Sequence, residues 1–198
     1  MYQFFETIKI VDGIIQNFAY HQKRVNESVL HSCKKENFHI LRDILTVPDN
    51  LKSGVVKCNF FFNENDFMVK YEKYELRNIK TLKLVNGDNI DYNYKYYDRT
   101  EIDDLYKQRN DCDDILIVKN NKITDTSISN IVLFDGAKWI TPDSYLLNGT
   151  CRQRLLEQNR IEAKPVYIDD IFHYNSLVLI NAMRGDDFEN VINISSIK

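Results

Sequence analysis

The sequence predicts an α+β protein made of two small domains. The first observation is that residues 1–77 contain strand-like segments before and after a helical one, so they form an α+β unit. The second is Ile115 to Val118, a short unbroken apolar run rich in β-branched residues, which is typical of a strand buried on both faces. The third is a crossover at 77–79, which leads into a new strand and begins the second domain at residue 81.

The composition is that of an ordinary globular protein. The chain has 198 residues, of which 43% are hydrophobic and 28% are charged. A net charge of −3 argues against a general nucleic-acid binder. No apolar run reaches the roughly 18 residues that a membrane span needs, and the first residues lack the basic and apolar regions of a signal peptide. We therefore expect neither nucleic-acid nor membrane partners.

The cysteines and histidines do not form a metal-binding pattern. The cysteines show no Cys-x-x-Cys spacing, and the histidines do not cluster with them. We expect reduced cysteines, no metal site and a cytoplasmic protein. The cysteines are Cys33, Cys58, Cys112 and Cys151.

The first domain is expected to combine strands with two helices. Asp12-Gly13 forms a turn that connects the first strand to a second, short strand. Phe18, Val25 and Val29 recur at the spacing of one face of a helix. In chain order we expect a strand at 4–10, a short strand after 13, helices at 18–32 and 40–45, and paired strands at 55–62 and 67–74.

The second domain is expected to be richer in strands. Asn120-Asn121 and Asp135-Gly136 both have the composition of tight turns between strands. Acidic residues early in the segment 100–109 suit the N-terminal end of a helix. In chain order we expect a strand at 81–85, a helix at 100–109, strands at 115–118, 131–134 and 138–140, a helix from 150, and a strand at 176–180.

A polar segment lies between the two inner strands of the second domain. Thr124 to Asn130 carry six hydrogen-bonding side chains in seven positions. Each such group that is buried without a partner costs about 1–3 kcal/mol. We therefore expect a bound polar ligand to satisfy them.

A turn followed by a helix start offers a place for an anion. Asn148-Gly149 supplies a tight turn, and Thr150 with Gln153 has the spacing of a capping box that opens a helix. Free amide groups and the helix dipole both face an anion at such a place. Because any capped helix has this pattern, a phosphate site there needs support from other residues.

Two segments together resemble the class IV aminotransferase family. The first is Lys95-Tyr-Tyr-Asp-Arg, and the second is Asp125-Thr-Ser-Ile-Ser-Asn130-Ile. Family members are pyridoxal-phosphate (PLP) enzymes of fold type IV, including branched-chain aminotransferases, D-amino acid aminotransferases and aminodeoxychorismate lyases. The resemblance implies that Lys95 forms a Schiff base with PLP and that Asp125 meets the pyridine nitrogen. The Lys-x-x-Asp-Arg spacing looks most like the lyase branch.

Three further segments resemble the family's binding site for the cofactor phosphate. His21-Gln-Lys-Arg24-Val is similar to His-x-x-Arg-Leu, which implies that the planar guanidinium of Arg24 binds the phosphate. Gly149-Thr-Cys-Arg is similar to the turn Gly-Ile-Thr-Arg, and Asn181-Ala-Met is similar to Asn-Ala-Leu. The resemblance therefore implies that these residues complete the site: Gly149, Thr150, Cys151, Asn181 and Ala182.

The resemblance also implies the architecture. It is the D-amino acid aminotransferase-like architecture of PLP fold type IV, with a small α+β domain at 1–77 and a larger pseudo-barrel domain at 81–198 that carries the Schiff-base lysine. We expect the chain to be N-terminally shortened, without a strand pair found in longer members. A homodimer is implied too, and the aromatic segments 60–62 and 71–74 would lie at an exposed surface that suits it.

The sequence departs from the family pattern at three site positions. Asp125 stands where the longer enzymes have glutamate, so it keeps the charge but reaches less far by one methylene. Cys151 and Ala182 replace threonines whose side chains bind the phosphate in some aminotransferases. In this chain backbone amides would bind the phosphate at these positions.

The function implied by the resemblance is a lyase of folate biosynthesis. It would convert 4-amino-4-deoxychorismate, a small-molecule amine, to 4-aminobenzoate and pyruvate, with Lys95 as the proton-transfer base. Thr7 matches the second threonine of the lyase's Phe-Thr-Thr-Ala-Arg, where branched-chain aminotransferases have glycine in Phe-Glu-Gly-Ile-Arg, and its hydroxyl would hydrogen-bond the departing group. Two alternatives stay open: a class IV transaminase that accepts a keto acid, and a shortened, non-catalytic protein that binds PLP.

Each of these residues also has a purely structural interpretation. Arg24 would then be a solvated charge on a helix, Lys95 a surface lysine, and Asp125 a turn residue. Thr7 would simply be a good strand residue. His21 is expected to be a partly buried helix residue rather than a catalyst. The joint spacing of the motifs, and not any single residue, favours the functional interpretation.

Overall fold

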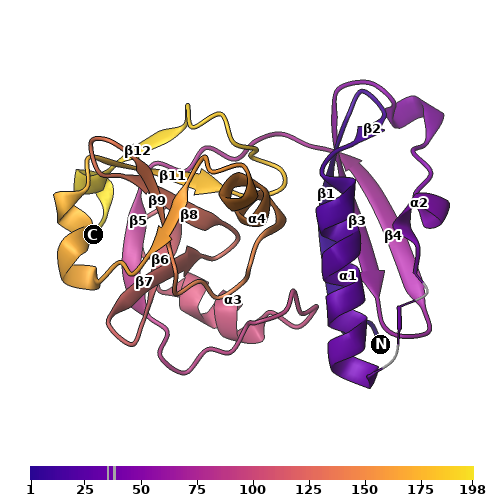
Figure 1. Cartoon of the computed structure of the whole chain (residues 1–198), viewed down its shortest axis with the longest axis horizontal. Coiled ribbons are helices and arrows are strands. Elements are labelled where there is room, and N and C mark those ends of the chain that lie inside the picture. Colours follow the sequence, from indigo (N-terminus) through magenta and orange to yellow (C-terminus); the bar gives the residue numbers. More distant parts are fainter. Residues whose placement is uncertain (35, 38) are drawn as a thin grey trace. The chain divides into compact units, whose positions relative to one another are not determined.

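The chain forms two compact units (Figure 1). A computed structural model describes residues 1–34, 36–37 and 39–198. The first unit is Met1–Leu76 together with Tyr94–Asp98, and the second is Arg77–Asn93 together with Arg99–Lys198. Lys95 therefore belongs to the first unit, whereas the sequence analysis assigned it to the second. Within the described residues, no helix is long and apolar enough to cross a membrane.

The first unit is built on a four-stranded antiparallel sheet. Its strand order is β2-β1-β3-β4. Buried and half-buried residues alternate strictly along β1 and β3, so one face of the sheet is core and the other is partly accessible. The strands are β1 (Phe4–Val11), β2 (Ile14–Ile15), β3 (Val55–Phe62) and β4 (Phe67–Lys73).

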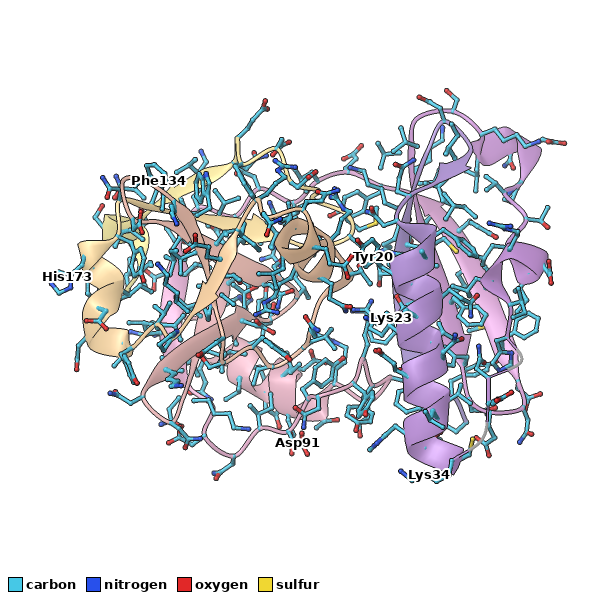
Figure 2. The ribbon with its side chains drawn as sticks, in the orientation of Figure 1. Tyr20, Lys23, Lys34, Asp91, Phe134 and His173 are labelled. Atoms are coloured by element: carbon cyan, nitrogen blue, oxygen red, sulfur yellow. The ribbon has the colours of Figure 1, made fainter. Side chains whose placement is uncertain are left out.

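Helix α1 (Phe18–Cys33) covers the buried face of this sheet (Figure 1). Its residues Val25 and Val29 pack in one cluster with Phe4 and Ile8 of β1. The helix ends at Cys33, and the next residue, Lys34, has a left-handed backbone (φ 58°) and donates its amide to the Leu30 carbonyl. Figure 2 labels Lys34 at this end of the helix. The second helix is shorter than the expected 40–45: α2 is the single turn Leu41–Ile44, and the 3₁₀ turn η1 (Asp49–Leu51) follows it.

The aromatic residues of β3 do not form an exposed surface. Phe60 and Phe62 are fully buried in the core of the first unit. Phe61 points to the opposite face, where its ring lies 6.1 Å from that of Phe5 and 5.6 Å from that of Tyr97. The expectation of an exposed surface at 60–62 was wrong for two of its three residues, because strand alternation turns them inward.

The segment that carries Lys95 adds to the free edge of β1. Tyr96 forms an antiparallel bridge with Phe4. The Phe5 amide donates to the Lys95 carbonyl at 3.0 Å, and the Tyr97 amide donates to the Gln3 carbonyl at 2.8 Å. β2 pairs with the other end of this β1 edge. These backbone bonds explain why Lys95 belongs to the first unit.

The second unit contains two sheets. The five-stranded sheet has the order β10-β9-β8-β11-β12, and the three-stranded sheet has the order β5-β6-β7. Its strands are β5 (Leu82–Asn86), β6 (Asp114–Lys119), β7 (Lys122–Thr126), β8 (Asn130–Phe134), β9 (Trp139–Pro142), β10 (Glu162–Lys164), β11 (Ser176–Ile180) and β12 (Val191–Asn193). Its helical segments are α3 (Thr100–Lys107), α4 (Thr150–Glu157), η2 (Ile168–His173) and η3 (Ile194–Ser196). Figure 2 labels Phe134 at the end of β8 and His173 at the end of η2.

One core lies between the two sheets of this unit. Leu116 and Ile123 from the smaller sheet pack with Leu133 and Leu177 from the larger one. Bridges between Leu82 and Ile197, and between Lys122 and Tyr167, join strands to segments outside their own sheet. The strand predicted at 115–118 is buried at all four positions, as expected for a strand covered on both faces.

Strand β7 was not predicted. A polar segment was expected after the Asn120-Asn121 turn, but the chain there forms a hairpin with β6. Asn120 and Asn121 both have left-handed backbones, with φ of 51° and 64°, which is the geometry of a type I′ turn. The strand could not be recognised from an apolar pattern, because its buried residues include threonines and an aspartate.

We expect matched valines of the larger sheet to differ sharply in their effect on stability. Val132 on β8 is 0% exposed and packs against Leu155, whereas Val191 on β12 is 53% exposed. Val132→Ala should lower the free energy of unfolding by about 2–3 kcal/mol, since it loses buried methyl groups and leaves a cavity. Val191→Ala should change it by less than about 0.5 kcal/mol. Urea denaturation measures both, and equal effects would contradict the assignment of the core.

Candidate active site

A buried carboxylate binds two basic side chains in the first unit. Glu6 occupies an inward position of β1 and is 1% exposed. Arg24 Nε donates to Oε1 of Glu6 at 2.6 Å, and Arg24 Nη2 donates to Oε2 at 2.6 Å. Nδ1 of His21 lies 2.6 Å from the same Oε2. Because His21 and Arg24 are three residues apart on α1, one face of the helix presents both to the strand.

This cluster fixes the charge of its members. Burial alone would raise the pKa of Glu6, but the charge and hydrogen bonds of Arg24 and His21 outweigh burial and hold the pKa at about 2. Burial lowers the pKa of His21 against the opposing effect of Glu6. Glu6 is therefore ionised and His21 neutral at pH 7. Since an ionised carboxylate only accepts hydrogen bonds, Nδ1 of His21 carries the ring's proton.

Arg24 is not the solvated helix charge of the structural interpretation. It is 6% exposed, and Glu6 occupies two of its three guanidinium nitrogens. The third, Nη1, has no hydrogen-bond partner within the described residues. Arg24 can therefore offer one charged donor to an anion while Glu6 holds the rest of the group in place.

Lys95 and Thr7 share the other face of the same sheet. Lys95 lies directly opposite Phe5 in the edge pairing, and its Nζ is 4.3 Å from the centre of the Phe5 ring. Thr7 follows Phe5 by two residues on β1 and so points to the same side. Its hydroxyl donates to Oδ1 of Asn59 on β3 at 3.2 Å. The two residues proposed for chemistry thus lie on one half-buried face.

Asp125 is held by a loop and an amide in the second unit. Its Oδ1 accepts a hydrogen bond from Asn130 Nδ2 at 2.8 Å. Its Oδ2 accepts from the backbone amides of Leu146 and Leu147 at 3.1 and 2.9 Å. A carboxylate oxygen has two lone pairs, so Oδ1 keeps one for a further donor.

Asp125 lacks the cations that surround Glu6. Burial raises the pKa of Asp125 to about 6 against the lowering effect of its hydrogen bonds, and Arg152 is the charged residue that acts on it. Arg152 is 3% exposed, donates to Pro142 and Asn148, and lies 4.3 Å above the Tyr145 ring. A cation bound next to Asp125 would remove the cost of its buried charge.

The turn before α4 packs tightly against Asn130. A Cβ atom at Gly149 would lie 2.1 Å from Asn130 Oδ1, so only glycine fits there. Asn130 Nδ2 also donates to the Leu147 carbonyl at 2.8 Å. The capping box expected at Thr150 was wrong: Gly149 is the N-cap, no side chain caps the helix, and Gln153 donates its side-chain amide to the Asn148 carbonyl.

The segment after β11 lies next to the same region. Asn181 Nδ2 donates to Ser129 Oγ at 2.9 Å, and Asn181 Oδ1 accepts from the amides of Met183 and Arg184. Cys151 Sγ donates to the Gly185 carbonyl at 3.4 Å. Ala182 is half-buried within this turn. The second unit therefore brings Asp125, Gly149, Thr150, Cys151, Asn181 and Ala182 to neighbouring turns.

Apart from the charge of Asp125, the polar segment 124–130 does not need a ligand to satisfy it. Thr124 Oγ1 donates to the Ile117 carbonyl at 2.8 Å, and the Ser129 amide donates to Thr126 Oγ1 at 3.1 Å. The Ser127 carbonyl accepts from Arg99 at 2.8 Å. The expectation of ligand-satisfied side chains was wrong for Thr124 and Thr126, because neighbouring backbone groups supply their partners.

Glu6 was not predicted, and His21 was expected to be only a partly buried helix residue. A signal for Glu6 was present: it falls between Phe4 and Ile8 in the inward register of a strand, where a carboxylate needs cationic partners. The matching donors stand on the next helix at His21 and Arg24. Arg152 was quoted in the turn motif without a role, and no sequence pattern indicated its burial next to Asp125.

A comparison with known families identifies the chain's relatives. The family described as amino-transferase class IV matches residues 3–186. The chain belongs to this family. The resemblance seen in the sequence is thereby confirmed, and so are the α+β fold class and its fold type IV architecture.

Individual relatives match over nearly the whole chain. An uncharacterized protein of Haemophilus influenzae is 37% identical over 187 residues, which is 93% of this chain and 100% of that protein. A crystal structure from Haemophilus somnus 129PT, provisionally named a 4-amino-4-deoxychorismate lyase, is 36% identical with a TM-score of 0.88 and covers 94% of this chain and 98% of its own. A hypothetical aminotransferase from Mycobacterium tuberculosis, in its PLP-bound form, is 14% identical with a TM-score of 0.73, covers 99% and 81%, and shows the shared fold alone.

The residues of this class IV aminotransferase family member fit the cofactor of the family. Asp125 is a buried carboxylate with one open lone pair and no full cationic partner, which suits a protonated ring nitrogen. Arg24 keeps one guanidinium nitrogen for an anion. No group of three or more histidine, cysteine, aspartate or glutamate side chains in the described part of the chain is placed to hold a metal ion.

The Glu6 cluster predicts how stability depends on pH. Because the folded-state pKa of about 2 lies below the ordinary 4.5, ionised Glu6 stabilises the fold above pH 4.5, and this contribution is lost as the pH falls towards 2. The shift corresponds to on the order of 3 kcal/mol. Urea denaturation from pH 7 to pH 2 should show a steeper acid loss for the wild type than for Glu6→Gln.

At pH 7 the same Glu6→Gln variant should be less stable by about 3–5 kcal/mol, since it breaks a buried ion pair. Glu72→Gln is the matched control in this unit. Its carboxylate is 58% exposed and pairs with Lys57, so its loss should cost less than about 1 kcal/mol. Parallel pH curves for the wild type and Glu6→Gln would rule out the cluster as the acid-sensitive element.

Proposed function

We propose that this class IV aminotransferase family member is a PLP-dependent lyase that converts 4-amino-4-deoxychorismate to 4-aminobenzoate and pyruvate. The observation that carries the proposal is that Lys95 and Thr7 lie on one face of the β1 sheet. The name of the 36% identical Haemophilus somnus structure supports the same reaction. The Lys95-x-x-Asp-Arg motif resembles the lyase branch too.

The family assignment implies which residues would hold PLP. Lys95 would bind it covalently, and Arg24 would bind its phosphate through Nη1. Asp125 would accept a hydrogen bond from the ring nitrogen at Oδ1. The turns at 149–151 and 181–182 would contribute backbone amides. Bound in this way, PLP supplies an electron sink for the carbon that loses a proton.

Lys95 would also act as the base. Its Nζ would take the proton from the carbon that bears the substrate amine. The Phe5 ring lies 4.3 Å from Nζ and covers one side of it. The same ring limits where the side chain can move, which keeps Nζ on the Thr7 face.

Thr7 would assist the departing enolpyruvate. The hydroxyl has one proton, which it now donates to Asn59 Oδ1 at 3.2 Å. To donate to the leaving oxygen it must release Asn59, and Asn59 must accept a bond from elsewhere. In this proposal the role of Thr7 therefore depends on Asn59, because their hydrogen bond must break before Thr7 can donate to the leaving oxygen.

A transaminase is the second candidate, and Glu6 is the residue that favours it. Glu6 matches the glutamate of the aminotransferase's Phe-Glu-Gly-Ile-Arg, whereas the lyase signature has threonine at that position. A transaminase would use the same Lys95, Asp125 and Arg24 with a keto acid as second substrate. A non-catalytic PLP-binding protein would show neither reaction. The homodimer stays a prediction, supported by family membership alone.

Cofactor attachment is the first test of this proposal. Pyridoxal 5′-phosphate followed by borohydride should fix one adduct on Lys95, as found by peptide mass spectrometry. Lys95→Ala should lose the adduct and all turnover, because it removes both the covalent anchor and the base. Lys9→Ala is the control, since Lys9 lies on the same face of β1 and should not be required. An adduct on another lysine, or none at saturating cofactor, would refute the assignment.

Reaction type is tested with substrates. Wild-type protein incubated with 4-amino-4-deoxychorismate should release 4-aminobenzoate and pyruvate in equal amounts. Thr7→Val should slow pyruvate release by roughly ten- to a hundredfold, the loss of one hydrogen bond to a charge-developing group. Its borohydride adduct on Lys95 should be unchanged. Steady amino transfer to a keto acid without 4-aminobenzoate would establish the transaminase instead.

A further inference from the structure

A cavity opens at one end of the three-stranded sheet of the second unit. It lies where the parallel strands β5 and β6 end, beside η2, and its volume is about 370 Å³. Pockets that bind small molecules have volumes from about 300 Å³, mostly apolar walls and a few polar groups. This cavity is lined in the same way by four apolar residues and three exposed polar ones. They are Leu84, Val85, Val118 and Ile168, with Asn86, Asp88 and Asn121.

The cavity is separate from the candidate active site. It lies at the carboxyl ends of two parallel strands, the end at which open sheets commonly bind ligands. Asn121 belongs to its rim, and the four residues from there to Asp125 span about 13 Å of extended strand. Asn130, Leu146 and Leu147, which bind Asp125, are not among the residues that line the cavity.

The outer edge of β5 keeps one acceptor and one donor beside the cavity. The Gly87 amide donates to the Val118 carbonyl of β6, so every second residue back from Gly87 faces β6. The residues between face the outer edge, where the Leu84 amide donates to the Lys198 carbonyl at 2.8 Å. The Leu84 carbonyl and the Asn86 amide point to this same edge. Neither has a hydrogen-bond partner within the part of the chain that the structure describes.

A carbonyl and an amide two residues apart on one edge select a particular kind of ligand. The ligand must donate to the Leu84 carbonyl and accept from the Asn86 amide with neighbouring atoms. An amino group next to a ring nitrogen meets both conditions, and adenine carries such a pair. The flat ring would then lie against the apolar side of the cavity, where Leu84 and Ile168 cover the core of the unit.

A peptide strand is the other group that pairs with a strand edge, and this edge is too short for it. Strand addition depends on several backbone hydrogen bonds along the edge. Lys198 already pairs with the Leu82 carbonyl and the Leu84 amide. One acceptor and one donor are then left beside the cavity, which is enough for a single ring and too few for a strand.

Asp88 adds a hydrogen-bond acceptor to the rim. Its Oδ1 accepts from the Asn120 amide at 2.6 Å, and its Oδ2 accepts from Asn86 Nδ2 at 3.0 Å. The bond from the Asn120 amide, together with that from Asn86, lowers the pKa of Asp88, so the carboxylate is ionised at pH 7. Each oxygen keeps a lone pair for a further donor. The hydroxyl groups of a ribose are donors of this kind.

We propose that this cavity is a binding site for a planar nitrogen heterocycle with an amino group next to a ring nitrogen, as in adenosine. The Leu84 carbonyl accepts from the amino group, the Asn86 amide donates to the ring nitrogen, and Asp88 accepts from the sugar. No covalent bond forms or breaks. The inference does not rest on the proposed function, because no residue of the candidate active site takes part.

The test is an amide NMR titration of the whole chain with adenosine. Up to about 5 mM adenosine should cause saturable shifts at Asn86 and Val118. Purine riboside, which lacks the amino group, should bind roughly two- to tenfold more weakly, since one hydrogen bond is lost. Absence of shifts with adenosine would overturn the site. Equal affinity for the two nucleosides would overturn the role of the Leu84 carbonyl.

Two variants of one residue isolate the backbone donor. Asn86→Ala and Asn86→Pro both lose the side-chain bonds to Asp88, but only the proline removes the amide hydrogen. Proline is tolerated on an edge strand where its nitrogen faces outward. Asn86→Pro should bind adenosine roughly two- to tenfold more weakly than Asn86→Ala, as followed at Val118. Equal binding refutes the edge assignment, and the nucleoside comparison on wild-type protein decides the point if the proline variant does not fold.

A third variant separates this inference from the proposed function. Lys95→Ala should lose cofactor attachment but bind adenosine as the wild type does. Adenosine shifts that appear at Asn130 and Leu147, around Asp125, and not at Asn86 would show binding in the candidate active site and overturn the inference. A wild-type protein that binds adenosine at Asn86 but forms no borohydride adduct with pyridoxal 5′-phosphate would support the cavity site and refute the PLP enzyme.

Discussion

A buried carboxylate costs several kcal/mol unless the protein surrounds it with donors or cations, and this chain places one at the centre of each unit. In the first unit that carboxylate is Glu6, in the inward row of β1 between Phe4 and Ile8. Helix α1 must therefore bring Arg24 and His21 onto one position of the sheet. This requirement fixes the register of the helix on the strand more specifically than apolar contacts such as those of Val25 would, because apolar contacts tolerate sliding.

The second carboxylate is balanced differently, and the difference has chemical consequences. Glu6 has a full cation in bidentate contact, so its pKa is held at about 2 and its charge is permanent. Asp125 has only amide donors and the more distant Arg152, so burial raises its pKa to about 6. In the first arrangement the carboxylate needs no further cation. The carboxylate of Asp125 would be stabilised by a nearby cation, and in a PLP-dependent family the protonated ring nitrogen can be that cation.

The sequence predicted those parts of the fold in which the pattern of apolar side chains indicates burial. The strands at 55–62 and 176–180 have the predicted bounds because alternation or an unbroken apolar run marks them. Strand β7 was missed because its buried residues are threonines and Asp125, and the position of Lys95 was missed because edge pairing with Phe5 joins residues far apart in sequence. In the site, motif spacing named Arg24 and Asp125. The inward register of β1 gave a signal for Glu6, the partner of Arg24, but no pattern indicated the amides of Leu146 and Leu147 that bind Asp125, because that hydrogen-bond network exists only in the packed structure.

Two neighbouring residues of β1 resemble different branches of the family, and strand alternation places them on opposite faces of the sheet. Glu6 resembles the aminotransferase branch and Thr7 the lyase branch, although they are neighbours on β1. The structure turns them to opposite faces: Glu6 is bonded to Arg24 and His21 under α1, whereas Thr7 bonds to Asn59 on the face that holds Lys95. Glu6 contacts the proposed phosphate ligand Arg24, so it would affect how tightly the cofactor binds. Both reactions need the cofactor to bind equally well. The choice of reaction depends on groups near the bond that breaks. Thr7 is therefore the more informative of the two, and the match at Glu6 counts little against the lyase.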